Sequence, residues 1–166
     1  NGTEDMPVFF CSTSKISFPS AGVAAMAASP ANMNVLKKRY SFQTIGYDKL
    51  NQLRHARYFK DYQGLMEHMK RHAEILRPKF EAVLSNLEKS LLGKGIASWT
   101  HPNGGYFVSV NVLSGCAERV VSLCKEAGVV LTPAGATYPY GKDPNDSNIR
   151  LAPTFPPVSE LETAMK

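Results

Sequence analysis

The sequence is poor in the features that mark several large classes of protein. It holds only three cysteines, Cys11, Cys116 and Cys124, an odd number without the spacing of a disulfide framework or a CxxC metal site. We interpret them as reduced thiols, as is usual in the cytoplasm. No apolar run approaches the length of about eighteen residues that a membrane span needs, and no signal peptide is recognisable. We therefore expect a cytoplasmic protein without membrane contact.

A strong charge of one sign is also missing. The formal charge is +5, and part of the basic excess falls in the run Lys37–Arg39, at the end of a predicted helix where cations favour the helix dipole. A nucleic-acid surface would need a denser basic stripe with interleaved aromatics. We therefore expect no nucleic-acid partner for this segment. The apolar fraction of 43% is ordinary for a globular protein, and 166 residues suffice for one substantial core or two small ones.

The most informative stretch that is present runs from Cys11 to Lys15 and follows the apolar residues 7–10. The apolar run predicts a buried strand that ends in a turn, and strand ends of α/β proteins commonly bind ligands. There Ser12 and Ser14 offer hydroxyls for phosphate oxygens, and the Lys15 amine can condense with a carbonyl. Taken alone, the segment is more typical of an ordinary solvated lysine.

Residues 48–92 carry a strong helical pattern. Asp48 can cap a first helix that ends near Phe59, and Asp61 can cap a second with apolar residues at three- and four-residue intervals. Pro78 falls inside the second helix and predicts a kink near Glu74. A helix of roughly thirty residues is too long for one small layer, so we expect it to connect two domains.

His68 and His72 lie four residues apart on this second helix, a spacing that allows both to bind one metal ion. Neither a third ligand nor the glutamate of an HExxH motif accompanies them. We therefore interpret the pair as part of a solvated helix face, and we predict no metal site.

The remainder of the chain predicts a small α+β layer. Strands 96–99 and 106–112 flank a glycine-rich turn and should form an antiparallel hairpin; a helix over 117–127 and a strand over 129–132 follow. A long loop then leads to a strand over 148–152 that carries Arg150. This arginine is either a surface charge on an edge strand or a clamp for a carboxylate, whose oxygen pair fits the planar guanidinium.

Four stretches of the sequence occur in the order seen in one known family: Ser12–Lys15, Pro102–Phe107, Val129–Gly135 and Asn148–Arg150. Lys15 and Arg150 are 135 positions apart (150 − 15). On these stretches the chain resembles the C-terminal half of class I/II pyridoxal-phosphate-dependent aminotransferases of fold type I, over essentially its whole length. Two longer strings resemble a narrower branch, labelled MocR-like or aspartate aminotransferase: Asn51–His55 and Thr132–Thr137.

The resemblance implies an α/β fold in which a long kinked helix joins two parts. One is the C-terminal end of the large domain of a fold-type I pyridoxal-phosphate-dependent transferase, and the other is a small α+β C-terminal domain. Residues 1–46 would end the large cofactor-binding domain with the lysine strand and loop, residues 47–77 would form the interdomain helices, and residues 78–166 the small domain. The chain starts at Asn1 without Met, and its last predicted helix stops early. We therefore expect the later part of a longer protein, inactive as an isolated fragment.

The resemblance also implies residue roles. Lys15 would be the catalytic residue that binds pyridoxal 5'-phosphate covalently and moves the substrate proton. Ser12 would bind the cofactor phosphate with help from Ser14, and Arg150 would hold the α-carboxylate of the substrate. The required acidic partner of the pyridine nitrogen and the stacking aromatic would lie outside these residues.

The sequence departs from the family pattern at one position. Many relatives carry an arginine two residues after the glycine that follows the lysine loop, where it pairs with the phosphate. Here Gly22 is followed by Val23 and Ala24, so that arginine is absent. The phosphate would then depend on hydroxyls, backbone amides and groups outside this segment.

The activity implied by the resemblance is transamination between an amino acid and a 2-oxo acid in a homodimer. Aspartate or another dicarboxylic amino acid with 2-oxoglutarate is the expected substrate pair. Two alternatives stay open. One is a MocR-type transcriptional regulator domain that senses pyridoxal phosphate, and the other is a different pyridoxal-phosphate reaction on the same fold, such as a β-lyase or decarboxylase.

Overall fold

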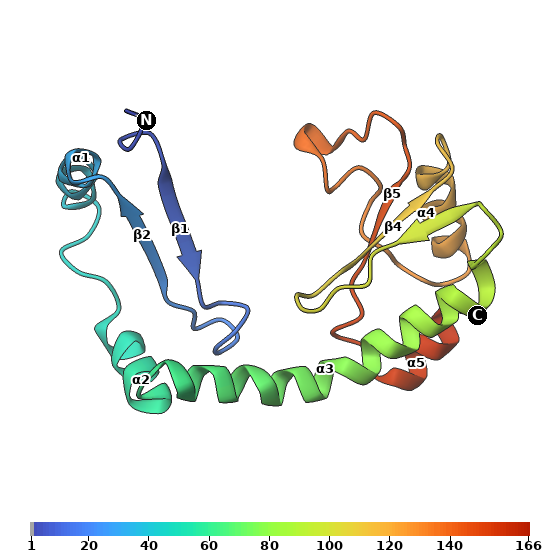
Figure 1. Ribbon diagram of the computed structural model, residues 1–166, viewed down its shortest axis with the longest axis horizontal. Coiled ribbons are helices and arrows are strands. Elements are labelled where there is room, and N and C mark those ends of the chain that lie inside the picture. The colour runs from blue at the N-terminus through green and yellow to red at the C-terminus, as the bar shows by residue number, and fades with distance from the viewer. Residues whose placement is uncertain (1) are drawn as a thin grey trace. The chain divides into compact units, whose positions relative to one another are not determined.

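The chain divides into two structural units between His72 and Ala73. The structure is a computed structural model that describes residues 2–166 (Figure 1). In chain order the elements are β1 (Val8–Ser12), β2 (Ala24–Ala28), α1 (Pro30–Tyr40), α2 (Lys49–Phe59), α3 (Tyr62–Leu91), β3 (Ala97–Trp99), β4 (Val108–Val112), α4 (Ala117–Glu126), the 3₁₀ turn η1 (Pro139–Gly141), β5 (Asn148–Leu151) and α5 (Val158–Ala164).

An antiparallel pair of strands, β1 and β2, begins the first unit, with Val8 opposite Ala28 and Ser12 opposite Ala24. The expected strands are therefore present, but the prediction that the first is buried was wrong. Phe9 and Phe10 are 66% and 74% exposed. The physical reason is that, within the described residues, this sheet has two strands, so neither of its faces is covered as in a larger layered fold.

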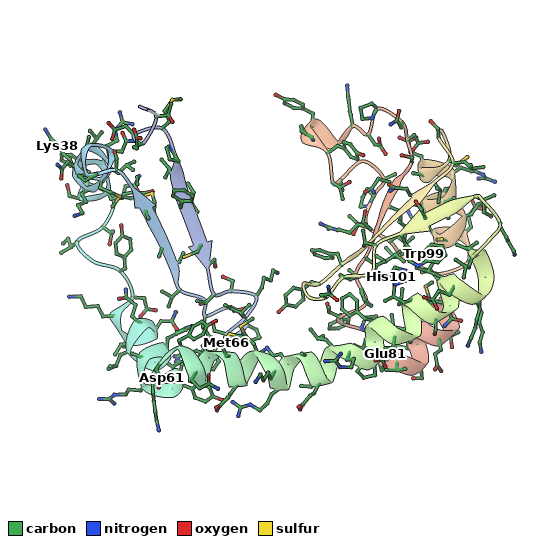
Figure 2. All side chains as sticks on the ribbon, viewed as in Figure 1. Lys38, Asp61, Met66, Glu81, Trp99 and His101 are labelled. Carbon is green, nitrogen blue, oxygen red and sulfur yellow. The ribbon has the colours of Figure 1, made fainter. Side chains whose placement is uncertain are left out.

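The corner between α2 and α3 is built by local chemistry that the sequence partly predicts. Asp48 caps α2 by accepting the N–H of Asn51 at 2.9 Å, and Asp61 caps α3 by accepting the N–H of Gly64 at 2.9 Å. Both expected caps are confirmed, and Figure 2 shows Asp61 at this corner. Lys60 has φ 65° and ψ −54°, and the Asp61 N–H donates to the Phe59 carbonyl at 2.7 Å, which makes a γ-turn.

Helix α3 runs as one element from Tyr62 to Leu91 with Pro78 inside it. The single long helix over this range agrees with the predicted pattern. The kink near Glu74 and the three-part division at residues 46 and 77 remain predictions. Within residues 2–166, no helix combines the length and the apolar character that crossing a bilayer requires.

The second unit holds the larger apolar core. Its sheet has the order β3-β4-β5 with antiparallel neighbours, so the expected hairpin of β3 and β4 is confirmed. Side chains of α3, β4, α4, β5 and α5 fill the core, and α5 lies alongside the second half of α3 (Figure 1). The buried core residues are Val83, Leu87, Val108, Val110, Ala117, Ile149 and Leu161.

The strand predicted over 129–132 is not formed. The residues after α4 lie outside the sheet, and Leu131 packs against the core from there. The reason lies at the start of the run, where the Val129 N–H donates to the Cys124 carbonyl at 2.8 Å and closes the end of α4 instead of pairing with a strand. An apolar run therefore contributes to the core here without strand pairing.

A close approach at the α2–α3 corner generates a stability prediction. A Cβ atom on Gly64 would overlap the Phe59 carbonyl oxygen. We expect Gly64→Ala to lower the free energy of unfolding by about 1–3 kcal/mol, because the backbone must shift to admit the methyl group. Gly46→Ala is the matched control, since its Cβ would meet only the end of the Lys49 side chain at 3.9 Å. Urea unfolding of the full-length protein measures both, and equal stability of the two variants would contradict the prediction.

Candidate functional site

Ser12, Ser14 and Lys15 meet in one turn at the end of β1. The Thr13 carbonyl accepts the N–H of Ile16 at 2.9 Å and of Ser17 at 2.8 Å, which folds the chain around Lys15. The Ser12 and Ser14 hydroxyl oxygens lie 2.7 Å apart, and the Ser14 N–H donates to Ser12 Oγ at 3.2 Å. Both serines and the lysine are exposed. The turn therefore presents two adjacent hydroxyls beside an amine on the surface of the first unit.

The lysine loop, residues 13–22, closes tightly onto itself. The Thr13 N–H donates to the Val23 carbonyl at 2.8 Å, and the Val23 N–H donates to Thr13 Oγ1 at 2.8 Å. A Cβ atom on Gly22 would overlap the Ser14 hydroxyl and would lie 2.7 Å from its Cα. Glycine at position 22 is therefore what allows the end of the loop to pass against Ser14.

Ser17, in the middle of the lysine loop, holds the loop against α2 and α3. It is 2% exposed, and its Oγ lies 2.9 Å from the Thr13 carbonyl oxygen and 2.8 Å from His55 Nε2. Its own carbonyl accepts from His68 Nε2 at 3.1 Å. The prediction of a solvated face for His68 was wrong, because this ring is 8% exposed and is used by the loop. The sequence signal was its position beside the apolar residues Leu65 and Met69.

Aromatic rings pack around these polar contacts. The Phe18 ring stacks on Phe59 at 5.4 Å between centroids and meets the edges of His55 and Tyr58, each at 5.1 Å. His68 contacts the same group, 5.9 Å from Phe18. The hydrogen bonds of Ser17 are thus made in apolar surroundings, where a lost partner is costly.

The two histidines of α3 face each other without forming a metal site. The ring centroids of His68 and His72 lie 4.2 Å apart. Burial lowers the pKa of His72 below its ordinary value, and the charges of neighbouring His68 and Arg71 lower it further. Across residues 2–166, no group of three histidine, cysteine, aspartate or glutamate residues is placed to hold a metal ion.

Arg150 belongs to the second unit and is held in a half-buried position on β5. Its guanidinium carbon lies 4.4 Å from the centroid of the Phe107 ring, and Nη2 donates to Thr132 Oγ1 at 3.4 Å. Its Nε is buried and has no hydrogen-bond partner among residues 2–166. A freely solvated surface charge would not be held in this way. An acceptor such as a carboxylate would satisfy the unused donor.

Asn148 supports the strand that carries Arg150. The sequence alone did not indicate this role. Its Nδ2 donates to Ser109 Oγ at 2.9 Å and to Asn111 Oδ1 at 2.8 Å, and its Oδ1 accepts from Thr137 Oγ1 at 2.8 Å. Asn148 is buried. Its side chain ties the long loop to β4, and the signal for this was its presence in the stretch Asn148–Arg150.

The loop before Asn148 is shaped by one carboxylate. Asp143 accepts the N–H groups of Asn145, Ser147 and Asn148 at 2.8–2.9 Å. The Ser147 N–H is the main reason that the pKa of Asp143 lies below its ordinary value, and the other N–H groups and the Ser147 hydroxyl add to the effect. The ionised carboxylate thus fixes the chain just before β5.

Comparison with known proteins places this chain among aminotransferases. The profile of the family described as "Aspartate amino-transferase" matches residues 1–166. An aspartate aminotransferase of Corynebacterium glutamicum is 49% identical over 156 residues, which cover 94% of this chain and 36% of that protein. The chain therefore spans little more than a third of the length of this relative.

Solved structures agree. The crystal structure of an aspartate transaminase from Corynebacterium glutamicum matches with a TM-score of 0.90 at 49% identity, over 94% of this chain and 37% of that one. Pyrococcus horikoshii kynurenine aminotransferase, solved in complex with PMP, matches with a TM-score of 0.80 at 22% identity, over 98% of this chain and 39% of that one. The second likeness shows the fold alone. The predicted α/β class is confirmed.

The pKa of Asp143 generates a pH-dependent prediction. A carboxylate whose folded-state pKa is lowered stabilises the fold at any pH above its unfolded-state pKa, which is about 4. This contribution is lost as the pH falls through the lower folded-state pKa. We expect Asp143→Ala to lower the melting temperature of the full-length protein at pH 7, by an amount that shrinks below pH of about 4. Glu162→Ala on α5 is the control for removal of an exposed carboxylate. A deficit in Asp143→Ala that does not change with pH would contradict the prediction.

Proposed function

Because the chain belongs to the aspartate aminotransferase family, we propose that it supplies the cofactor-binding lysine of a pyridoxal-phosphate-dependent amino-acid aminotransferase. The observation that carries the proposal is the turn at the end of β1, where two adjacent serine hydroxyls accompany Lys15. The proposed donor is aspartate or another dicarboxylic amino acid, and the proposed acceptor is 2-oxoglutarate. The amino group and hydrogen of the donor exchange with the oxo oxygen of the acceptor, so no external oxidant is needed.

Lys15 is proposed to hold the cofactor and to move a proton. Its Nζ can bind the cofactor aldehyde carbon, with loss of the aldehyde oxygen as water. When bound, pyridoxal phosphate supplies an electron sink for the bonds at the substrate Cα. With the substrate amine in its place, Lys15 Nζ would take the proton from that Cα and deliver it to the cofactor carbon that had carried the aldehyde. An exposed lysine at a hydrogen-bonded turn suits both tasks, because its amine must change partners while the backbone beneath it stays in place.

Ser12 and Ser14 are proposed to bind the cofactor phosphate. Their exposed hydroxyls lie 2.7 Å apart, so both can turn to one phosphate group. The hydroxyl of Thr13, between them in sequence, accepts the Val23 N–H and faces the base of the loop. This difference favours the two serines over the threonine. Two exposed hydroxyls also suit a site without an arginine after Gly22, because hydroxyls and turn amides must then supply more of the phosphate binding.

Arg150 is proposed to bind the α-carboxylate of the amino acid and of the oxo acid. The Phe107 ring holds the guanidinium from one side, and Nε is buried without a partner among the described residues. A carboxylate would accept from this donor and from a neighbouring terminal N–H in a two-bond contact. Binding of this kind orients the substrate and thereby contributes to rate.

The remaining parts of the proposal are a homodimer in the cytoplasm that acts on small molecules. The homodimer and the small-molecule substrates rest on the family resemblance, and the cytoplasmic location rests on the cysteine pattern and on the sequence having no recognisable signal peptide. No observation on the described residues favours the regulator or the other pyridoxal-phosphate reactions, so we propose neither.

The substrate assignment is tested by an amino-donor screen on the full-length protein. With pyridoxal phosphate bound, each donor is added without an acceptor, and the loss of the visible absorption of the lysine-bound cofactor is followed. We expect aspartate or glutamate to react faster than alanine, leucine or phenylalanine. A preference for an apolar donor would overturn the dicarboxylic assignment while leaving the reaction class intact.

Replacing Lys15 tests the reaction class. We expect Lys15→Ala in the full-length protein to lose detectable transamination and the visible absorption of the lysine-bound cofactor, because no other residue of the turn offers an amine. Lys37→Ala on α1 is the control for removal of an exposed lysine. The melting temperature should stay close to that of the wild type in both variants. Turnover at the wild-type rate in Lys15→Ala would remove this residue from the mechanism.

Replacing Arg150 tests the carboxylate contact. Arg150→Lys keeps the charge but removes the planar fork, and we expect kcat/KM to fall by about 10–100-fold for both the amino acid and the oxo acid, the effect of losing one charge-assisted hydrogen bond. Arg119→Lys on α4, where the arginine is exposed, is the matched control. If Arg150→Lys retained the wild-type kcat/KM for both substrates, the assignment would fail.

A further inference from the structure

Two side chains of α2, one helical turn apart, contact opposite ends of the lysine loop. Asn51 reaches the end of the loop, where its Nδ2 donates to the Ala21 carbonyl at 2.8 Å and to the Gly22 carbonyl at 3.3 Å. His55 reaches the start, where its Nε2 lies 2.8 Å from Ser17 Oγ and 3.4 Å from Thr13 Oγ1. Both residues belong to the string Asn51–His55, which carried part of the family resemblance without a role of its own.

One contact of His55 determines which of its two ring nitrogens carries the hydrogen. Nδ1 lies 2.9 Å from the Asn51 carbonyl oxygen, and because a carbonyl only accepts, Nδ1 must carry the hydrogen. In the neutral ring Nε2 then accepts. The Ser17 hydroxyl has one hydrogen, which can go to Nε2 at 2.8 Å or to the Thr13 carbonyl oxygen at 2.9 Å. The contact with Asn51 also orients the ring, so the helix backbone sets the direction from which His55 meets the loop.

The loop needs this external support. Ser12, Ser14 and Lys15 are exposed, so burial of their side chains contributes little to fixing the turn. Ordering a flexible backbone costs conformational entropy at every residue. The contacts that offset this cost lie at the base, where Ser17 is 2% exposed and is bonded by His55 from α2 and by His68 from α3.

We propose that Asn51 and His55 are positioning residues, which hold the lysine loop so that the Lys15 amine and the two serine hydroxyls keep one arrangement for the cofactor. The proposal rests on the proposed function. Neither residue is assigned a contact with the cofactor or the substrate. They act through the backbone at residues 21–22 and through the hydroxyl of Ser17.

Conservative variants of the full-length protein separate positioning from packing. His55→Phe keeps a ring against Phe18 and Phe59 but removes both nitrogens, and Asn51→Asp keeps the size of the side chain but removes the donor to the Ala21 and Gly22 carbonyls. His55→Gln can place an amide near the position of Nε2 and should restore much of the contact with Ser17. Arg54→Ala, an exposed change on the same helix, is the control.

Two measurements without turnover report on the loop. Amide hydrogen exchange in the absence of cofactor should rise about tenfold or more at Thr13, Ser17 and Val23 in His55→Phe and Asn51→Asp. Borohydride trapping of added pyridoxal phosphate, read by peptide mass, should show several-fold less labelling of Lys15. In steady-state assays kcat should fall by about 10–100-fold, as expected for a misplaced catalytic group, with KM for the oxo acid little changed. His55→Gln should recover most of each loss, and Arg54→Ala should match the wild type.

The outcomes keep the two proposals apart. If wild-type Lys15 is not labelled, the proposed function fails, while the exchange rates still decide whether α2 holds the loop. If His55→Phe and Asn51→Asp exchange and label as the wild type does, the positioning proposal is overturned and the proposed function stands. If His55→Phe does not fold, Ser17→Ala makes the same test from the loop side, because it removes the hydroxyl that His55 contacts and leaves the ring in place.

Discussion

The buried hydroxyl of Ser17 is the constraint on which the first unit depends. Its Oγ lies 2.8 Å from His55 Nε2 on α2, and the carbonyl of the same residue accepts from His68 Nε2 on α3 at 3.1 Å. The ring of the next residue, Phe18, stacks on Phe59. A buried polar group left without a partner costs about 1–3 kcal/mol. Any movement that lifts the loop from α2 and α3 would separate Ser17 from both histidines at once. The loop is therefore held to both helices through its buried residue, Ser17.

This arrangement separates two requirements that one residue could not meet. The Lys15 amine has to be reachable and has to change partners, which exposure allows. Its backbone has to stay fixed, which exposure does not provide. The backbone is fixed by residues that take no part in the chemistry. The Ser17 hydroxyl and the Asn51 amide bond it, and glycine at position 22 lets the chain pass Ser14, which a Cβ would overlap.

Local rules predicted much of this from the sequence, and long-range contacts account for most of the rest. The caps at Asp48 and Asp61 and the hairpin of β3 and β4 follow from short-range patterns, and the structure has them. The Ser17 contact of His68 joins residues far apart in the chain. The sequence therefore did not reveal it, and the lack of further metal ligands led to the wrong prediction that this ring is solvated. The apolar run 129–132 was predicted as a strand because a short apolar run does not reveal whether it pairs with a strand or, as here, only packs Leu131 against the core.

The candidate site residues were found through the resemblance to a known family, whereas the groups that support them were found through hydrogen bonds in the structure. Asn148 illustrates the difference, because its side chain makes hydrogen bonds with Ser109, Asn111 and Thr137, and a short string of letters contains none of these partners. Such a fully bonded amide stabilises the strand that carries Arg150 without being available to a ligand.

Unsatisfied polar atoms distinguish the groups that are available. Within residues 2–166, three buried side-chain polar atoms lack a hydrogen-bond partner: Asn51 Oδ1, Trp99 Nε1 and Arg150 Nε. Buried polar groups are normally paired, so each exception calls for an explanation. The unpaired atom of Trp99 is a neutral indole N–H, which costs less to leave unpaired than a charged donor. For Arg150 the donor belongs to a cation, for which an unpaired position is more costly and an anionic partner more favourable.

Asn51, bonded through its other amide atom to the end of the lysine loop, is the second exception at a candidate site. Two of the three exceptions thus fall on residues with a proposed role, and only that of Arg150 is a proposed contact with a ligand.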